Sequence, residues 1–280
     1  MNASSHAAFA VMLVFASAHG IDNFHTQMSK ILHENVSLNC DICIEGVPAE
    51  LWKSDSPWLR NPGVGLRFNE AHWERSSQVD VYNPMLDVNF QTLDGIDVGL
   101  IYSHSILLEE TPGFGFGRFK RESHADSVGV YVAKHFNCGF RAGAAYSYTT
   151  DDFGSFPQSD TSGASATIGF ARSFGEQRLG RNVFIDTSAN FVYYTTVEAW
   201  DFLWLAKMGQ SFSDRFGAYG VFNLYHSLER GGRPFAEAGG GLQAQIVRSV
   251  TFILEGTTPV IDRSKPDIAF QFRTALHWRF

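Results

Sequence analysis

Large apolar side chains alternate with small or polar ones along residues 267–280. One set of alternate positions is apolar except for a single threonine: Ile268, Phe270, Phe272, Thr274, Leu276, Trp278 and Phe280. The intervening set contains no large apolar residue: Asp267, Ala269, Gln271, Arg273, Ala275, His277 and Arg279. A repeat of two residues is that of a β-strand, whose side chains point alternately to its two faces. The length of the run fits a tilted membrane-spanning strand, which needs about 9–11 residues. The pattern therefore predicts a strand with lipid on one face and a polar interior on the other.

The end of this strand carries a second feature. Trp278 and Phe280 place two aromatic side chains at alternate positions. This ending resembles the C-terminal signal by which bacterial outer-membrane barrels are recognised by their assembly machinery. The alternative is a long amphipathic strand of a soluble sandwich that ends in Phe, but the termini of soluble domains are usually polar and frayed.

The same alternation recurs along most of the chain and predicts further strands. They are expected at residues 63–73, 79–90, 96–108, around 128–132, 140–149, 164–170, 183–197, 199–212, 215–228, 234–247 and 249–262. Residues 112–122 are treated as a loop or a strand extension, because single-chain bacterial barrels prefer even strand numbers. Short turns such as 248–249 and long polar connections such as 150–162 fit short periplasmic turns and long outer loops. The prediction is an all-β fold, an antiparallel transmembrane barrel of about twelve strands over residues 63–280.

Strand parity also predicts which side chains line the lumen. The expected lumen-lining residues are Arg141, Asp186, Asn190, Glu237, Gln243, Gln245, Gln271, Arg273, His277 and Arg279. Eight strands make a barrel whose interior side chains just fill, so twelve strands leave space for a narrow passage. A polar lining indicates a wet interior without naming a substrate.

The start of the chain predicts export. Residues 7–18 are the longest apolar stretch, too short for a membrane-spanning helix of about 20 residues. This stretch fits the apolar core of a signal peptide over residues 1–18, and Ala16-Ser17-Ala18 fits its cleavage site. The absence of Lys and Arg from residues 1–8 departs from the usual pattern, and a buried N-terminal helix is the alternative. With strands as the membrane segments, export predicts the cell outer membrane of a Gram-negative bacterium.

Residues 19–62 differ from the strands that follow. Phe24, Met28, Ile31 and Leu32 recur at helical spacing and predict a short helix within residues 21–36. The rest is irregular, so the segment is a periplasmic extension, a plug that enters the lumen, or a lead-in to the first strand. Cys40 and Cys43 are expected to form a local disulfide, because no second pair completes a zinc site and no thioredoxin-like context is visible.

Composition narrows the function classes. The chain has 22 Lys+Arg against 29 Asp+Glu, a formal net charge of −7. This balance argues against a nucleic-acid partner, which requires a basic patch. The 25 Phe and 26 Gly against only 9 Pro suit strands with aromatic girdles and glycine at points of curvature. No motif predicts a cofactor or a metal ion.

Some outer-membrane barrels are enzymes, and titratable residues near the outer rim of the barrel could form an active site. The candidates are His104, His124, Asp126, Asp151, Asp152, His226 and Glu229. They do not form a nucleophile motif: the Gly-x-Ser-x-Gly, His-Glu-x-x-His and phosphate-binding loop patterns are all absent from the sequence. The sequence therefore predicts a protein without catalytic residues.

The end of the chain resembles the outer-membrane transporter family named for the meta-pathway of phenol degradation. The shared features are the glycine-rich strand and alternating strand of residues 238–256, the Pro266-Asp267 pair, and a last strand that ends in Arg279-Phe280. Residues 79–108 also resemble the early strands of that family. The resemblance implies uptake of small aromatic or apolar compounds. Residues 21–60, with Cys40 and Cys43, depart from what this family leads us to expect.

A second resemblance is to the translocator barrel of autotransporters. That barrel also has twelve strands and an aromatic-x-Phe ending, and it follows a pore-threading helix, a role that residues 21–36 could fill. No passenger stands between the signal peptide and this segment, which departs from the autotransporter pattern.

The expected function is an outer-membrane, porin-like channel or transporter for small molecules. The alternatives are a plugged structural or autotransporter-like barrel, and an outer-membrane enzyme at the barrel rim. The expected partners are outer-membrane lipid and lipopolysaccharide, the barrel assembly machinery and a small-molecule cargo.

Overall fold

The computed structural model describes twelve strands and parts of their connections. The described residues are 59–74, 78–92, 96–112, 118–136, 139–152, 161–174, 183–194, 199–213, 215–228, 234–247, 249–261 and 268–279. The strands are β1 (Leu59–Glu74), β2 (Gln78–Thr92), β3 (Ile96–Pro112), β4 (Arg118–His135), β5 (Phe140–Asp152), β6 (Thr161–Phe174), β7 (Val183–Tyr194), β8 (Ala199–Ser213), β9 (Phe216–Ser227), β10 (Phe235–Val247), β11 (Val250–Ile261) and β12 (Ile268–Arg279).

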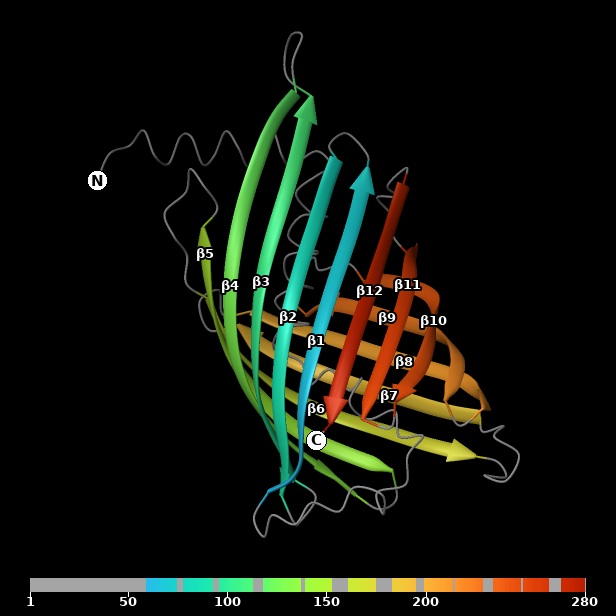
Figure 1. Cartoon of the computed structure of the whole chain (residues 1–280). Coiled ribbons are helices and arrows are strands. Elements are labelled where there is room, and N and C mark those ends of the chain that lie inside the picture. The colour runs from blue at the N-terminus through green and yellow to red at the C-terminus, as the bar shows by residue number, and fades with distance from the viewer. Residues whose placement is uncertain are drawn as a thin grey trace.

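The strands form one closed antiparallel barrel (Figure 1). Each strand pairs with its neighbours in sequence, and β1 pairs with β12 from Gly63 opposite Arg279 to Glu74 opposite Ile268. Closure leaves no strand edge with unpaired backbone groups, which is the condition for a sheet to cross lipid. The predicted fold class, an all-β antiparallel barrel of twelve strands, is confirmed.

The outer face of the barrel is apolar, because one residue in two along each strand points outward. Large hydrophobic side chains are exposed there on nearly every strand, for example Leu66, Leu100, Val128, Val130, Ile168, Met208, Leu242 and Phe272. Such a continuous apolar surface would cause aggregation in water. It instead matches the lipid-facing band of a membrane barrel.

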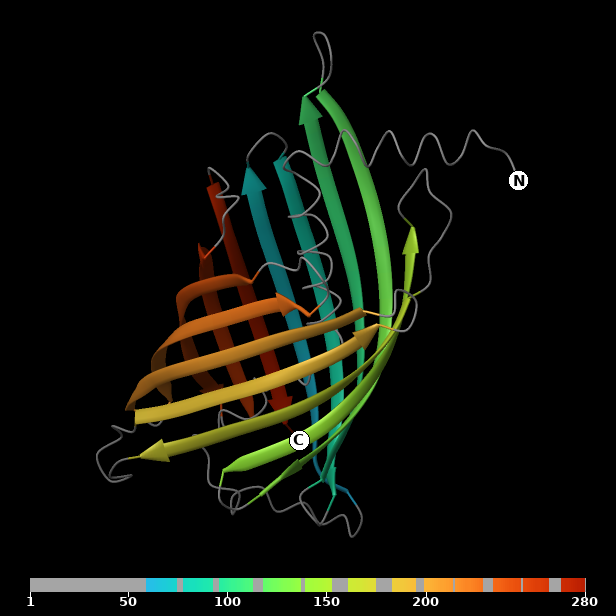
Figure 2. The same ribbon diagram turned by 180° about the vertical axis from the view of Figure 1, so that it is seen from behind.

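The two walls of the barrel cross at a steep angle. Figure 2 shows β7 to β10 running across the view while β1 to β4 run nearly upright behind them. This is the expected consequence of closing tilted strands into a barrel. The tight β10–β11 connection and the β1–β12 seam at Arg279 lie at the same end, which the predicted topology assigns to the periplasm. The end of β5 and the start of β6 lie at the opposite end of the barrel, and the long outer loop predicted between them falls outside the described residues.

The β3–β4 hairpin is the longest in the barrel and extends beyond its neighbours (Figure 1). Its far part is polar on its outer face. There Asp126 accepts hydrogen bonds from Tyr102 and His104, each at 2.8 Å, and Lys120 forms an ion pair with Glu110. Residues 118–122 therefore belong to a strand extension, one of the two alternatives predicted for residues 112–122.

The connection between β4 and β5 shows why a glycine is required at one position. Gly139 has a φ of 92°, in the left-handed region that favours glycine. Its N–H donates to the carbonyl of Phe136 at 2.9 Å, and its carbonyl accepts from Ala171 of β6 at 2.8 Å. The turn thus reverses the chain, and its hydrogen bond to Ala171 also joins it to β6.

Several predictions lie outside the described residues. These are the signal peptide, the helix within 21–36 and the pair Cys40 and Cys43. The first strand begins at Leu59, slightly before the boundary predicted at residue 63. In the twelve ranges given above, no helix is long and apolar enough to span a membrane.

Candidate functional site in the barrel lumen

The inner face of the barrel is lined mainly by polar side chains. The buried charged residues on this face are Arg67, Asp87, Arg141, Asp186, Asp201, Lys207, Glu237 and Glu255. Serine, threonine and asparagine occupy many of the positions between them, for example Ser103, Ser127, Ser147, Thr167 and Asn190. Buried charges are stable only when they are paired or hydrogen-bonded, so the pairing inside the lumen determines what it can do.

The structure places most of the predicted lumen residues on this inner face. Arg141, Asp186, Asn190 and Glu237 are buried, and Gln243, Gln245, Gln271, Arg273 and His277 are half-buried. Trp278 points outward and is half exposed. The side chain of Arg279, together with Phe280, Cys40 and Cys43, lies outside the described residues.

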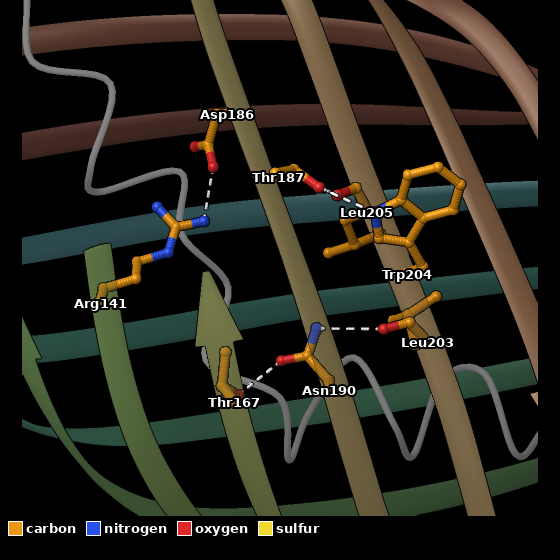
Figure 3. Close-up of polar contacts among 8 residues, drawn as sticks. All are labelled: Arg141, Thr167, Asp186, Thr187, Asn190, Leu203, Trp204 and Leu205. Carbon is orange, nitrogen blue, oxygen red and sulfur yellow. Dashed lines mark hydrogen bonds and ion pairs between the residues drawn. The ribbon is translucent and has the colours of Figure 1, made fainter. Parts of the chain in front are cut away.

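A buried ion pair joins two of the predicted residues across an intervening strand. Nη2 of Arg141 on β5 lies 2.5 Å from Oδ1 of Asp186 on β7, with β6 between them (Figure 3). The side chains are only 3% and 9% exposed. Because the guanidinium lies on the carboxylate, neither charge projects singly into the lumen.

A string of hydrogen bonds continues along the same wall. Thr167 on β6 donates to Oδ1 of Asn190 at 2.6 Å, and the amide of Asn190 on β7 lies 3.5 Å from the carbonyl of Leu203 on β8 (Figure 3). Asn190 is fully buried. Its side-chain oxygen bonds to β6 and its side-chain nitrogen bonds to β8. These bonds fix the relative position of three neighbouring strands.

The most highly charged cluster on the inner face is centred on Glu255 of β11. Its Oε2 atom lies 2.9 Å from Nζ of Lys207 on β8 and 2.7 Å from Nη2 of Arg273 on β12. Tyr219 of β9 donates to the same oxygen at 3.2 Å, and Nζ of Lys207 lies 5.3 Å from the centre of the Tyr219 ring. Asp186 of β7 stands directly opposite Lys207 in the sheet, so the cations of this cluster lie among acidic side chains from two strands.

The opposite wall has an acidic centre at Asp87 of β2. Tyr131 of β4 donates to Oδ1 of Asp87 at 3.2 Å, and the amide of Asn89 donates to Oδ2 at 3.2 Å. Arg67 of β1 lies on the same wall and donates to Sδ of Met85 at 3.6 Å. Asp201 is held in a similar way near the outer end, where Tyr225 donates to it at 2.5 Å.

The inner face also carries apolar patches between these polar clusters, including a small one of Leu203, Leu205 and Tyr225. Another comprises Met85, Ile101, Tyr131 and Ala133, with Ala145 packed against it. A third comprises Phe184, Tyr219, Val221, Ile253 and Ala275. The lumen wall is therefore amphipathic, with aromatic and aliphatic surface next to paired charges.

Sequence reasoning missed several of these residues, namely Asp87, Tyr131, Lys207, Tyr219 and Glu255. Their strands were predicted, but the prediction did not assign the two faces of those strands to lipid and lumen. Lys207 and Glu255 alternate with Met208 and Leu254, which point outward. Extending the same repeat of two residues to these strands would have identified them.

The titratable residues considered for a rim enzyme are only partly brought together. His104, His124 and Asp126 meet on the outer face of the β3–β4 hairpin, where the two imidazole rings stack with centres 5.6 Å apart. Nε2 of His124 is also 3.2 Å from Glu122. His226 lies half-buried on β9, and the side chains of Asp151, Asp152 and Glu229 are outside the described residues. Within the described strands no group of three or more such side chains could hold a metal ion.

No protein-family model and no curated protein matches this sequence. Solved structures of membrane barrels do match its fold. The β-domain of the Bordetella autotransporter BrkA is 12% identical with a TM-score of 0.55, over 80% of this chain and 100% of that one. The transport unit of the autotransporter AIDA-I from Escherichia coli is 9% identical with a TM-score of 0.52, over 91% and 97%. An outer membrane channel from Pseudomonas putida F1 is 8% identical with a TM-score of 0.55, over 84% and 100%.

These identities are too low to show more than a shared fold. The chain has the fold of a twelve-stranded outer-membrane barrel, the fold of channels and of autotransporter translocators. This fold and the apolar exterior together place the barrel in an outer membrane, as predicted. The second predicted resemblance, to autotransporter translocators, agrees with this fold, whereas the resemblance to the phenol-degradation family stays a prediction.

Proposed function

We propose that this protein is a passive outer-membrane channel for small molecules. The observation that carries the proposal is the inner wall, where polar and charged side chains follow the strands from Asp201 and Glu237 near one end to Arg141 near the other. Such a lining can form hydrogen bonds with water and polar solutes along the whole length of the lumen. Twelve strands give a lumen wider than one filled by its own side chains.

The proposed cargo is a small compound with an apolar or aromatic part. Support comes from two of the inner apolar patches, around Met85 and Ile101 on one wall and around Phe184 and Ile253 on the other. Binding sites for small molecules are mostly apolar with a few placed polar groups, and here Lys207 and Arg273 adjoin the second patch. The proposed function is passage through the barrel without catalysis.

The experiment is single-channel recording with the purified protein in planar lipid bilayers, together with liposome swelling in small neutral and aromatic solutes. Discrete conductance steps and solute-dependent swelling are expected. Protein denatured before addition is the control. A barrel that inserts in folded form but passes neither ions nor solutes would sink the proposal.

The proposed partners follow from the same membrane location. The apolar exterior requires outer-membrane lipid, and the polar outer part of the β3–β4 hairpin suits contact with lipopolysaccharide head groups. Delivery by the barrel assembly machinery is proposed from the aromatic ending at Trp278, which the structure places on the outer face of β12.

A second candidate function is a plugged barrel, and one observation favours it. Val192 points inward and yet is 0% exposed, although strand side chains alone do not fill a lumen of this width. Residues 19–58, which precede β1, are the candidate for the covering segment. Deleting residues 21–56 would raise the conductance of a plugged barrel, and an unchanged conductance would contradict the plug.

A further inference from the structure

Three inward-facing glycines occupy equivalent places in the wall. Gly99 on β3, Gly169 on β6 and Gly241 on β10 each lie beneath a long side chain from one neighbouring strand. In every case that side chain continues over the glycine and bonds to an acid on the strand beyond it. We call Gly99, Gly169 and Gly241 the bridged glycines.

At Gly99 the bridging side chain is Tyr131. Tyr131 on β4 stands directly opposite Gly99 on β3, and its hydroxyl donates to Asp87 on β2 at 3.2 Å. A Cβ atom added to Gly99 would lie 2.3 Å from both Cε1 and Cζ of the Tyr131 ring. The ring therefore rests on the backbone of β3 and could not do so above any other residue.

At Gly169 the bridging side chain is Arg141. Arg141 on β5 stands opposite Gly169 on β6 and reaches Asp186 on β7 at 2.5 Å. A Cβ atom at Gly169 would lie 2.4 Å from Nε of Arg141 and 3.0 Å from its Cγ. The Arg141 side chain thus passes close to the backbone of β6 at Gly169, and Figure 3 shows the ion pair that it forms with Asp186.

At Gly241 the bridging side chain is Tyr219. Gly241 on β10 stands between Tyr219 on β9 and Glu255 on β11 in one row of the sheet. The Tyr219 hydroxyl donates to Glu255 at 3.2 Å, and an added Cβ would lie 2.5 Å from Cζ of the ring. This bridge also orients the carboxylate that holds Lys207 and Arg273.

We propose that the bridged glycines set the bore and the charge of the channel. Each lets a side chain of Tyr or Arg size lie along the wall, where it neutralises or binds an acid two strands away. With any larger residue at the glycine, the bridging side chain must leave the wall and move toward the barrel axis, because the strand backbone blocks the other direction. They are positioning residues, and this inference rests on the proposed channel function.

The two kinds of bridge have different electrical consequences. Displacing the side chain of Tyr131 or Tyr219 from the wall narrows the lumen with an uncharged ring. Displacing the side chain of Arg141 narrows the lumen with a cation, while the carboxylate of Asp186 stays at the wall. Only the substitution at Gly169 is therefore expected to move ion selectivity toward anions as well as to lower conductance.

The test is single-channel recording of Gly99→Ala, Gly241→Ala and Gly169→Ala in planar bilayers. All three are expected to conduct less than the unsubstituted protein, and Gly169→Ala is expected to shift the reversal potential in a salt gradient toward anion preference. Gly220→Ala is the matched control, because an added Cβ on this outward-facing glycine meets no atom closer than 3.8 Å. Its conductance should be unchanged.

Rescue separates a change of bore from general damage to the barrel. In the double variant Gly99→Ala with Tyr131→Ala, no ring remains to be displaced, so conductance is expected to return to at least the original value. Heat-modifiable migration on gels verifies that each variant is folded. Lowered conductance that the second substitution does not restore, or unchanged conductance in all three glycine variants, would overturn the inference.

The two proposals fail in different ways. If the unsubstituted protein does not conduct, the channel function fails and this inference fails with it. If the unsubstituted protein conducts and the glycine variants match Gly220→Ala, the channel stands and only the role of the bridged glycines is wrong.

Discussion

Arg141 on β5 and Asp186 on β7 form an ion pair at 2.5 Å across the full width of an intervening strand. The pair is buried in the wall of a membrane barrel, so its two charges depend on each other more than a surface pair would. It links three strands of one wall through side chains in addition to their backbone ladders.

Replacing Arg141 with alanine should therefore destabilise the barrel strongly. Asp186 would be left as a buried charge without this cation, and breaking a buried pair in this way costs about 3–5 kcal/mol. Urea unfolding in phospholipid vesicles, followed by tryptophan fluorescence, measures the change. The double variant with Asp186→Ala should recover part of the loss, and equal stability of Arg141→Ala and the parent protein would contradict this account.

Replacing Glu255 with glutamine should change the ion selectivity of the channel. Lys207 and Arg273 share its Oε2 atom, so removing its negative charge makes the electrostatic potential at this wall more positive. The reversal potential in a salt gradient is expected to move toward anions. Glu122→Gln is the control, because Glu122 lies on the exterior with 59% of its side chain exposed. A shift of the same size in both variants would argue against a lumen effect.

Arginine in place of Val130 should destabilise the barrel because Val130 is 49% exposed on the lipid-facing side. A charge near the bilayer midplane of such a barrel costs about 2–4 kcal/mol, and the cost falls toward 0–1 near the interfaces. Glu122→Arg, on the same face of β4 but in its polar outer part, should cost much less. The same urea titration compares them, and equal losses would mean that the lipid band is misplaced.

Alanine at Trp278 should slow assembly more than it weakens the finished barrel. Trp278 is 50% exposed on the outer face of β12 and belongs to the proposed recognition ending. The folded fraction after incubation with purified assembly machinery in vesicles is the measurement. Phe272→Ala, another outward aromatic of β12 with 48% exposure, should fold at nearly the parent rate, and identical delays in both variants would count against a specific signal.

The fold could be predicted from the sequence because membrane strands obey one strict rule. Lipid on one face and polar groups on the other force a repeat of two residues, as in Phe270, Gln271, Phe272 and Arg273. The rule gives no signal where large apolar residues do not alternate with polar ones. Residues 118–127 of β4 contain only Phe119 and Ala125 as apolar residues, so no periodic pattern indicated that they belong to a long strand.

The site could be predicted only in part. The repeat of two residues shows which face of the sheet a side chain lies on, but it does not show which other side chain it contacts. It placed Arg141 and Asp186 on the same face, but their contact depends on the barrel register and on Gly169 between them. A glycine in a strand is usually taken as a weak point or a bulge. That Gly99, Gly169 and Gly241 make room for a neighbour becomes apparent only when three strands are aligned.

The seam between β1 and β12 determines when the barrel can be finished. From Gly63 to Glu74, every backbone partner of β1 on this side belongs to residues 268–279. Until those residues arrive, β1 presents an open edge, and open edges pair readily with other chains. The barrel therefore cannot close around a partial chain, because its first strand waits for its last, which makes closure the final step of folding.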